Sequence, residues 1–301
     1  MRSEPLDGSR LDVSRVGLGC NNFGGRLDLE RTREVVDAAL DAGITFFDTA
    51  DIYGNRGGSE RFLGELLEGR RDRVVLATKF GNDMGEGQNG TPEYAGRALR
   101  ASLERLRTDR VDLFYYHRPD GVTPVTETLA AMQELVREGL TREIGCSNFS
   151  AEQLQEADDF ARENGGPRFV AVQNHYSLLE RDAERDVLPA AGRLGVAFIP
   201  YFPLASGLLT GKYRRGGPRP QGTRLEGREI DDETFDRIEA LDAFARERGR
   251  TLLELAIAAL ASRPEIPSVI AGATSAEQVR TNAASADWDL SPEDLAALPL
   301  L

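Results

Sequence analysis

The chain has 301 residues, 40% of them apolar, so it can bury a core large enough for one large domain or two ordinary ones. Its 50 acidic and 37 basic residues give a formal charge of −13, which argues against nucleic acid and anionic membranes as partners, because both demand a cationic face. A mononucleotide cofactor needs only a local basic contact and stays compatible with this charge.

The N-terminal sequence MRSEPLDGSRLD lacks both the apolar segment and the small-residue cleavage pattern of a secretory signal. No stretch approaches the roughly 18 apolar residues that a membrane-spanning helix needs. The two cysteines, Cys20 and Cys146, do not make a disulfide framework. These features favour a cytoplasmic protein in a reducing compartment.

Short runs rich in Val, Ile and Phe recur along the chain, each followed by a helical pattern. We expect eight of them to be β-strands: VGLGC, ITFFDTA, VVLATK, VDLFYYH, EIGCSN, FVAVQN, VAFIPYF and PSVIAGA. Amphipathic stretches between them, for example 31–42, 125–140 and 151–163, have helical spacing.

The regular alternation of strand and helix implies parallel strands that are buried on both sides. The simplest closure is an α/β fold of the (β/α)8 TIM barrel type, forming a single domain over residues 1–301. A doubly wound open sheet is the alternative, but the first strand continues as GLGCNNFGG, which breaks the GxGxxG pattern of that fold. A short N-terminal β-hairpin, turning at Asp7 and Gly8, is expected to close the barrel floor.

Capping residues mark two helix starts. Ser59 is expected to be the N-cap of the helix after the second strand, and Ser150 with Gln153 three residues later has the pattern of a capping box. Two irregular loops, residues 81–94 and 212–224, follow the third and seventh strands. They are expected to leave the carboxyl end of the barrel, where active sites of this fold lie.

Polar side chains recur where the expected strands end. Asp48 ends the second strand, Tyr53 lies in the loop after it, Lys79 ends the third strand and His117 ends the fourth. Because the strands of a parallel barrel end on one rim, these four side chains are expected to meet there.

Such a group suits proton transfer. A tyrosine keeps its proton at neutral pH, and an ammonium about 4 Å away favours the phenolate by roughly 4 kcal/mol at an effective dielectric near 20. Lys79 is therefore expected to lower the pKa of Tyr53, Asp48 to anchor Lys79, and His117 to orient a carbonyl oxygen. None of these groups moves electrons, so the chemistry needs an external nucleophile such as hydride from a nicotinamide.

The four residues at these intervals resemble the Asp-Tyr-Lys-His tetrad of the aldo-keto reductases. The likeness continues over nearly the whole chain, through the segments DTADIYG, TKFG, GCSNFS, QNHYS, YFPLASGLLTGKY and IAGATSAEQVRTN. The resemblance implies a (β/α)8 barrel that uses NADPH. It also implies hydride transfer between NADP(H) and an aldehyde, a ketone or the corresponding alcohol, sugar-derived ones included, with Tyr53 as general acid or base.

The resemblance further implies which residues contact the cofactor. Ser147, Asn148 and Gln173 match residues that hold the nicotinamide carboxamide, and Tyr201 matches the aromatic residue that stacks on its ring. The other matches are Leu204, Ser206, Leu208 and Lys212 in the pyrophosphate loop, and Gly272, Thr274, Gln278 and Asn282 around the adenosine end. Asp48 counts among these contacts too, and Asn21 after the first strand is a further candidate contact of the nicotinamide.

The adenosine segment departs from the family pattern. Many members place Lys and Arg where this chain has Gly272 and Gln278, and Glu where it has Thr281. NADPH remains the preferred cofactor, with NAD as an alternative, because another cation can replace the lost contact with the 2′-phosphate. The candidate cations are Lys212, Arg214, Arg215, Arg219 and Arg224.

Two other functions stay open. One is a nicotinamide-binding regulatory subunit resembling the channel-associated members of the family. The other is a barrel hydrolase using Asp48 and Asp51, which is disfavoured because Lys79 would keep Asp48 ionised. No metal site is expected, since the two histidines show no paired-ligand spacing, and His175 is interpreted as structural. The expected partner is a small carbonyl or alcohol substrate, and the sequence indicates neither its identity nor an oligomeric state.

Overall fold

The computed structural model describes residues 1–218 and 221–299. Its central feature is a nearly closed barrel of eight parallel strands, hydrogen-bonded in the order β10-β3-β4-β5-β6-β7-β8-β9, with β10 beside β9 in space. The strands are β3 (Val16–Gly19), β4 (Phe46–Asp48), β5 (Val75–Phe80), β6 (Val111–Tyr116), β7 (Thr141–Ser147), β8 (Phe169–His175), β9 (Ala197–Tyr201) and β10 (Val269–Gly272). All eight predicted strands and the (β/α)8 TIM barrel are confirmed.

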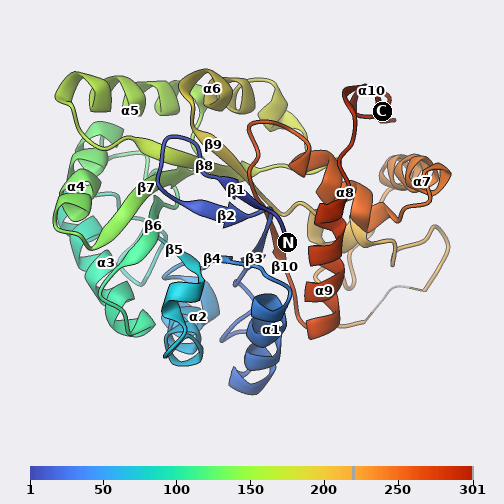
Figure 1. Cartoon of the computed structure of the whole chain (residues 1–301), viewed down its shortest axis with the longest axis horizontal. Coiled ribbons are helices and arrows are strands. Elements are labelled where there is room, and N and C mark those ends of the chain that lie inside the picture. The colour runs from blue at the N-terminus through green and yellow to red at the C-terminus, as the bar shows by residue number, and fades with distance from the viewer. Residues whose placement is uncertain (219–220, 300–301) are drawn as a thin grey trace.

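Helices form a ring outside the strands (Figure 1). The α-helices are α1 (Leu29–Asp41), α2 (Tyr53–Leu66), α3 (Pro92–Leu106), α4 (Val125–Arg137), α5 (Ala151–Asn164), α6 (Val187–Leu194), α7 (Asp232–Glu247), α8 (Leu252–Ala261), α9 (Ala276–Ala284) and α10 (Pro292–Ala296). Short 3₁₀ turns are η1 (Arg71–Arg73), η2 (Asp182–Glu184), η3 (Ala205–Thr210) and η4 (Ser285–Asp287). Within the described residues, no helix has both the length and the apolar character needed to cross a membrane.

The N-terminal hairpin closes the barrel floor, as predicted. Strands β1 (Ser3–Pro5) and β2 (Asp12–Ser14) pair antiparallel, and Gly8 turns the chain with φ +73°. Leu6, Leu11 and Val13 are buried in one cluster with inward-facing residues of the barrel strands. The hairpin therefore seals one end of the barrel and leaves the carboxyl ends of the strands as the open rim.

The strands are largely apolar because most of their residues are buried on both faces of the sheet. In β6, Leu113 and Tyr115 belong to the cluster inside the barrel, whereas Phe114 and Tyr116 pack in the cluster under the helices. Alternate residues thus fill two different cores, which explains why these strands lack the alternation of polar and apolar residues seen in a half-exposed sheet.

The capping predictions had different outcomes. Ser150 and Gln153 form the capping box of α5, as predicted. The prediction for Ser59 is wrong, because its hydroxyl does not cap α2, whose regular part begins only after the left-handed residues Gly54 to Gly57. Its hydroxyl instead donates to the carbonyl oxygen of Cys20 at 3.0 Å and lies 2.8 Å from the hydroxyl of Thr49. Ser59 therefore ties α2 to the ends of β3 and β4.

Candidate active site

Lys79, at the end of β5, is completely buried inside the rim of the barrel. Its ammonium forms an ion pair with Asp48 and donates to the carbonyl oxygen of Thr49 at 2.8 Å. Gln173 on β8 donates to the second carboxylate oxygen of Asp48 at 2.9 Å. The Asp48 carboxylate therefore balances the charge of Lys79, and both of its oxygens have hydrogen-bond partners. The three side chains link the ends of β4, β5 and β8.

Tyr53 and His117 complete the group around this ammonium. The Lys79 nitrogen lies 5.3 Å from the centroid of the Tyr53 ring. The Tyr53 and His117 rings meet edge to face, with centroids 5.9 Å apart and planes at 86°. The structure therefore brings together all four residues that the sequence placed at the strand ends.

The environment acts on the Tyr53 phenol in opposite directions. Burial has the largest effect and raises its pKa, while the charge of Lys79 lowers it. The effect of Lys79 has the predicted sign, but burial exceeds it, so the net pKa lies above its ordinary value rather than below it. For Lys79 itself, burial opposes the charged form, but Asp48 and Tyr53 favour it more strongly and the pKa is raised. At neutral pH the site therefore holds a protonated phenol beside an ammonium.

His117 is neutral. Burial is the main reason that its pKa lies well below the usual range, and the charges of Lys79 and Arg118 act in the same direction. A neutral ring has one N–H group and one free lone pair, so it can donate one hydrogen bond to an oxygen placed between it and Tyr53.

A second set of polar groups lies beside these residues. The Tyr201 hydroxyl donates to Asn148 at 2.8 Å, and the Asn148 amide donates to the carbonyl oxygen of His117 at 2.9 Å and to the hydroxyl of Ser147 at 3.1 Å. Asn148 holds a left-handed conformation with φ +60°, which is strained for a residue other than glycine. One face of Tyr201 stacks on His175, with centroids 5.3 Å apart and planes at 5°. His175 thus supports Tyr201, in keeping with the structural role predicted for it.

The loop after β9 turns back toward the rim through η3. Leu204, Ser206 and Leu208 lie in or next to η3, all partly buried, and Ser206 has φ +57°. Lys212 follows at the exit of this turn, and its ammonium lies 5.4 Å from the centroid of the Tyr213 ring.

Three cations gather in front of this turn. Arg224 donates to Asn21 at 2.9 Å and its guanidinium lies 5.3 Å from the centroid of the Phe202 ring. Arg26, on the loop after β3, donates to the carbonyl oxygen of Gly222. Burial first and the charge of Arg26 second lower the pKa values of both Lys212 and Arg224. None of the three has a carboxylate partner among the described residues, so this cluster favours an anion.

The other predicted cations are placed differently. Arg214 pairs with Asp242 at 3.0 Å, and Arg215 pairs with carboxylates of α7. Both arginines are therefore held by ion pairs to α7. Arg219 lies outside the described residues. Arg26 was not among the predicted cations, since an arginine in a glycine-containing loop gives no signal until the loop after β9 is seen to reach it.

The predicted adenosine segment forms the end of β10 and the start of α9. Gln278 accepts a hydrogen bond from the Thr274 backbone at 2.9 Å, while Ser275 caps the helix. Gly272 is exposed and Asn282 is buried within α9. Gln278 and Thr274 thus satisfy each other and offer no positive charge to a phosphate.

Asp51 does not join the site. It is 1% exposed, and neither of its carboxylate oxygens has a hydrogen-bond partner in the described part of the chain. A substrate cannot reach a carboxyl group buried in this way, which weighs against a hydrolase that uses Asp48 and Asp51 together. Among residues 1–218 and 221–299, no cluster of three or more His, Cys, Asp or Glu side chains could hold a metal ion.

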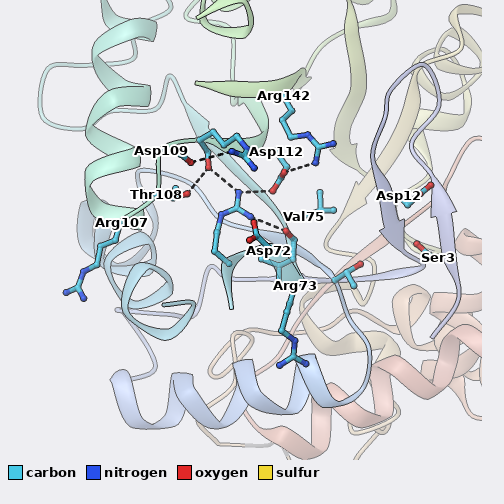
Figure 2. A pocket seen from close by; sticks show the side chains of 14 residues that line it. Ser3, Asp12, Asp72, Arg73, Val75, Arg107, Thr108, Asp109, Asp112 and Arg142 are labelled. Carbon is cyan, nitrogen blue, oxygen red and sulfur yellow. Dashed lines mark hydrogen bonds and ion pairs between the residues drawn. The ribbon is translucent and has the colours of Figure 1, made fainter. Parts of the chain in front are cut away.

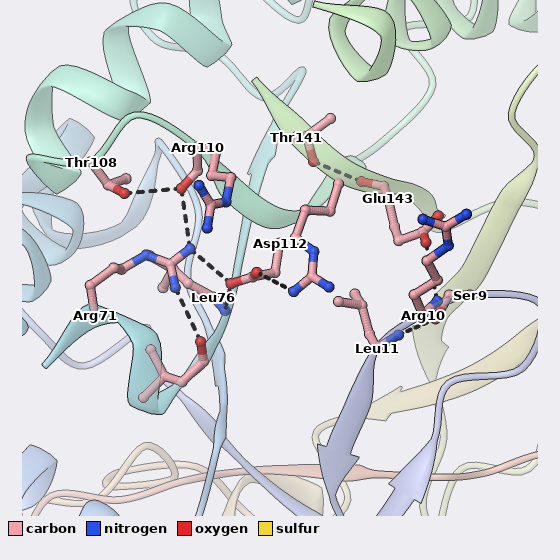
Figure 3. Close-up of polar contacts among 12 residues, drawn as sticks. Ser9, Arg10, Leu11, Arg71, Leu76, Thr108, Arg110, Asp112, Thr141 and Glu143 are labelled. Carbon is pink, nitrogen blue, oxygen red and sulfur yellow. Dashed lines mark hydrogen bonds and ion pairs between the residues drawn. The ribbon is translucent and has the colours of Figure 1, made fainter. Parts of the chain in front are cut away.

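A hollow of about 650 Å³ lies at the opposite end of the barrel, beside the hairpin (Figure 2). The carboxylate of Asp112 there pairs with Arg71 at 2.8 Å and with Arg142 at 3.2 Å, and accepts from the Leu76 backbone at 2.9 Å (Figure 3). Arg73, which also lines the hollow, points away from this network (Figure 2). The paired charges join the starts of neighbouring strands, so we interpret this end as structural.

Comparison with known proteins agrees with this arrangement. The sequence pattern of the Aldo/keto reductase family matches residues 15–299. A probable voltage-gated potassium channel subunit beta of Oryza sativa subsp. japonica is 36% identical, over 95% of this chain and 92% of the relative. The uncharacterized oxidoreductase YrpG of Bacillus subtilis (strain 168) is also 36% identical, over 96% of this chain and 92% of the relative. The L-glyceraldehyde 3-phosphate reductase of Escherichia coli (strain K12) is 34% identical, over 91% of this chain and 84% of the relative. The chain therefore belongs to the aldo/keto reductase family.

Proposed function

We propose that the protein is an NADP(H)-dependent oxidoreductase that interconverts an aldehyde or ketone, sugar-derived ones included, and the corresponding alcohol. The observation that carries this proposal is the buried Lys79 ammonium between the Asp48 carboxylate and the Tyr53 ring, with His117 edge-on to that ring. This arrangement provides a proton donor and an oxygen-orienting group in one place. The relatives named as an oxidoreductase and a reductase support oxidoreductase chemistry.

The polar groups of the rim fit a nicotinamide nucleotide. Ser147, Asn148 and Gln173 offer hydroxyl and amide groups suited to a carboxamide, and Tyr201 offers an aromatic face for its ring. The cations Arg26, Lys212 and Arg224, which have no carboxylate partner in the described residues, suit its phosphates. When bound there, the nicotinamide supplies or accepts the hydride.

The protein's own residues handle the proton and the carbonyl oxygen. His117 orients the oxygen, and Tyr53 gives it a proton in reduction or takes the proton in oxidation. Lys79 partly offsets the rise in the pKa of Tyr53 that burial causes, and Asp48 keeps Lys79 charged and in place. Each pKa unit of this offset corresponds to about 1.4 kcal/mol between the two protonation states.

Replacing the phenol tests the role of Tyr53. Tyr53→Phe keeps the ring beside Lys79 and His117 but removes the proton, so we expect kcat to fall at least about a hundredfold. The dissociation constant of NADP should stay within about twofold, because the cations and amides of the rim are unchanged. Turnover close to that of the unchanged protein would refute the assignment of Tyr53 as the acid.

The preference for NADP over NAD is assigned to the cation cluster, since Gly272, Thr274 and Gln278 of the adenosine segment carry no charge. We expect NADP to bind at least about tenfold more tightly than NAD. Lys212→Ala and Arg224→Gln should narrow this difference, whereas Arg214→Ala, whose guanidinium pairs with Asp242, should leave it unchanged. Fluorescence titration with both nucleotides measures the difference, and equal affinities in the unchanged protein would rule out NADP selectivity.

The substrate class is open to a direct assay. The relative named L-glyceraldehyde 3-phosphate reductase makes a phosphorylated aldehyde a useful first candidate, and the exposed Arg118 beside His117 is placed to meet an anionic group. Aldehydes, ketones and sugars, with and without phosphate, can be followed in both directions by the absorbance of NADPH. The two buried, unpaired cysteines are consistent with a protein that works in the cytoplasm.

A regulatory subunit is the second candidate, because relatives in Oryza sativa and Arabidopsis thaliana are named probable potassium channel beta subunits. Nucleotide binding would then serve to sense the cofactor rather than to turn over a substrate. Slow turnover of every carbonyl in the panel, together with stable association with a partner protein, would favour this function. Rapid turnover of one substrate would favour the enzyme.

A further inference from the structure

Asn82, in the loop after β5, faces the ring of His117. Its amide nitrogen lies 2.9 Å from Nδ1 of the ring. An amide nitrogen can only donate, so Nδ1 must accept this hydrogen bond with its lone pair. The hydrogen of the neutral ring is then left on Nε2.

The backbone around Asn82 accounts for this placement. Tyr116 pairs with Phe80 across β5 and β6, and the His117 backbone continues the ladder by donating to the carbonyl oxygen of Phe80 at 2.8 Å. Gly81 then turns the chain with φ +110°, and a Cβ atom there would lie 2.9 Å from the Tyr116 ring. Only glycine fits this turn, which brings Asn82 back across to the neighbouring strand.

The choice of nitrogen matters because the ring is neutral. The charged or titratable groups that face His117 are Lys79 from β5, Tyr53 from α2 and Arg118 next to it in the chain, and none of them is an anion at neutral pH. With no carboxylate to draw a second proton onto the ring, one N–H must serve the substrate. If Nδ1 carried the hydrogen, Nε2 would present a lone pair to the carbonyl oxygen and repel it.

We propose that Asn82 is a positioning residue that fixes His117 in the Nε2–H form, so that the ring donates a hydrogen bond to the carbonyl oxygen of the substrate. The first part concerns the protein alone, and the second part rests on the proposed reductase function. The two parts can therefore be tested separately.

Nitrogen-15 NMR of the imidazole rings tests the first part without any turnover. The chain has two histidines, so comparison with His175→Gln assigns the ring of His117. We expect its hydrogen on Nε2 in the unchanged protein, and a mixture of the two forms or the Nδ1–H form in Asn82→Ala. Hydrogen on Nδ1 in the unchanged protein would overturn the proposal, as would an unchanged spectrum in Asn82→Ala.

Kinetics of three variants test the second part. Asn82→Ala should lower kcat roughly ten- to a hundredfold with little change in NADP affinity, because an ordered hydrogen-bond donor to the reacting oxygen is lost. Gln88→Ala, an exposed residue of the same loop, is the matched control and should leave kcat unchanged. Equal kcat in Asn82→Ala and the unchanged protein, despite an altered tautomer, would overturn the second part.

Asn82→Asp, the third variant, gives a signature that a merely structural role would not produce. Its carboxylate accepts rather than donates, so it raises the pKa of His117 and, once the ring is neutral, holds the hydrogen on Nδ1. We expect kcat of this variant to fall as the pH rises through the new pKa, since only the doubly protonated ring still has a hydrogen on Nε2. A pH profile parallel to that of the unchanged protein would contradict the proposal. If no carbonyl substrate is turned over at all, the reductase function fails while the NMR result still decides the role of Asn82.

Discussion

Asp51 is a carboxyl group in surroundings that oppose its charge. Burial first, and the charge of the neighbouring Glu60 second, raise its pKa from 3.8 to about 7, and Arg105 and Lys79 offset only part of this. Glu60 already binds Arg105 and Thr78 at 2.6 and 2.5 Å, which leaves Asp51 without a hydrogen-bond partner in the described residues. The folded state therefore holds the Asp51 proton more tightly than the unfolded state does.

This raised pKa predicts how stability depends on pH. The contribution of Asp51 is fully present below about pH 4 and is lost as the pH rises to about 7, so the free energy of unfolding should decrease over this range. Asp51→Asn removes the titration and should stabilise the protein by up to about 4 kcal/mol at pH 8, with little effect at pH 4. Urea unfolding at both pH values measures the change, with Asp41→Asn at the exposed end of α1 as control. Equal effects of Asp51→Asn at the two pH values would show that Asp51 does not titrate in this range.

Among the elements, the start of α2 decides where Tyr53 lies. The four residues after it, Gly54 to Gly57, all have positive φ values, so the chain makes a left-handed turn before the regular helix begins. A Cβ atom on Gly54 would lie 2.4 Å from the carbonyl oxygen of Phe23 and 2.6 Å from the Ser59 nitrogen. This close contact between α2 and the loop after β3 holds the phenol against Lys79.

A substitution in this turn should damage the site through geometry alone. Gly54→Ala should lower the free energy of unfolding by about 2–4 kcal/mol, since left-handed strain and a steric clash add, and should reduce kcat by displacing Tyr53. Gly69→Ala is the matched control, because Gly69 has φ +72° and a Cβ atom there would meet no other atom within 4 Å, so the change should cost only about 1–2 kcal/mol. Chemical denaturation and steady-state kinetics of the two variants separate strain from steric clash. Equal destabilisation by both would mean that the contact with Phe23 can relax.

The strands could be predicted from the sequence, whereas the start of α2 could not. A strand buried on both faces is recognisable in the sequence as an almost continuous apolar run, such as VDLFYYH, because the side chains on both faces pack in an apolar core. The N-cap prediction for Ser59 used a local rule, but the left-handed residues before it are set by contact with the loop after β3, some thirty residues earlier in the chain. For the site, residue types at strand ends predicted Lys79 and its neighbours. The net direction of the Tyr53 pKa shift depended on burial, which residue type does not reveal.

At the scale of the whole molecule, the net charge of −13 has the same sign as the charge of the proposed cofactor. The net charge should repel a nucleotide that approaches from a distance, but Arg26, Lys212 and Arg224 lie together with no carboxylate partner in the described residues. The Debye length is about 10 Å at 0.1 M salt, so the distant carboxylates are screened first and contacts in the partly buried cluster last. The local cluster should therefore control affinity, and the overall charge should have only a minor effect on the rate of association.

If the local cluster controls affinity, added salt should weaken the binding of NADP. If the net negative charge controlled it, added salt should strengthen binding. As NaCl rises from about 0.05 to about 0.5 M, NADP should bind several-fold more weakly, because the added anions compete with its phosphates for the three cations. Arg224→Gln should weaken binding at low salt and flatten this dependence, while Arg214→Ala, already paired with Asp242, should leave the slope unchanged. Calorimetric titration across the salt series gives the slopes directly. Binding that tightens with added salt would mean that repulsion by the acidic surface outweighs the cluster, and that the cofactor phosphates do not contact these three cations.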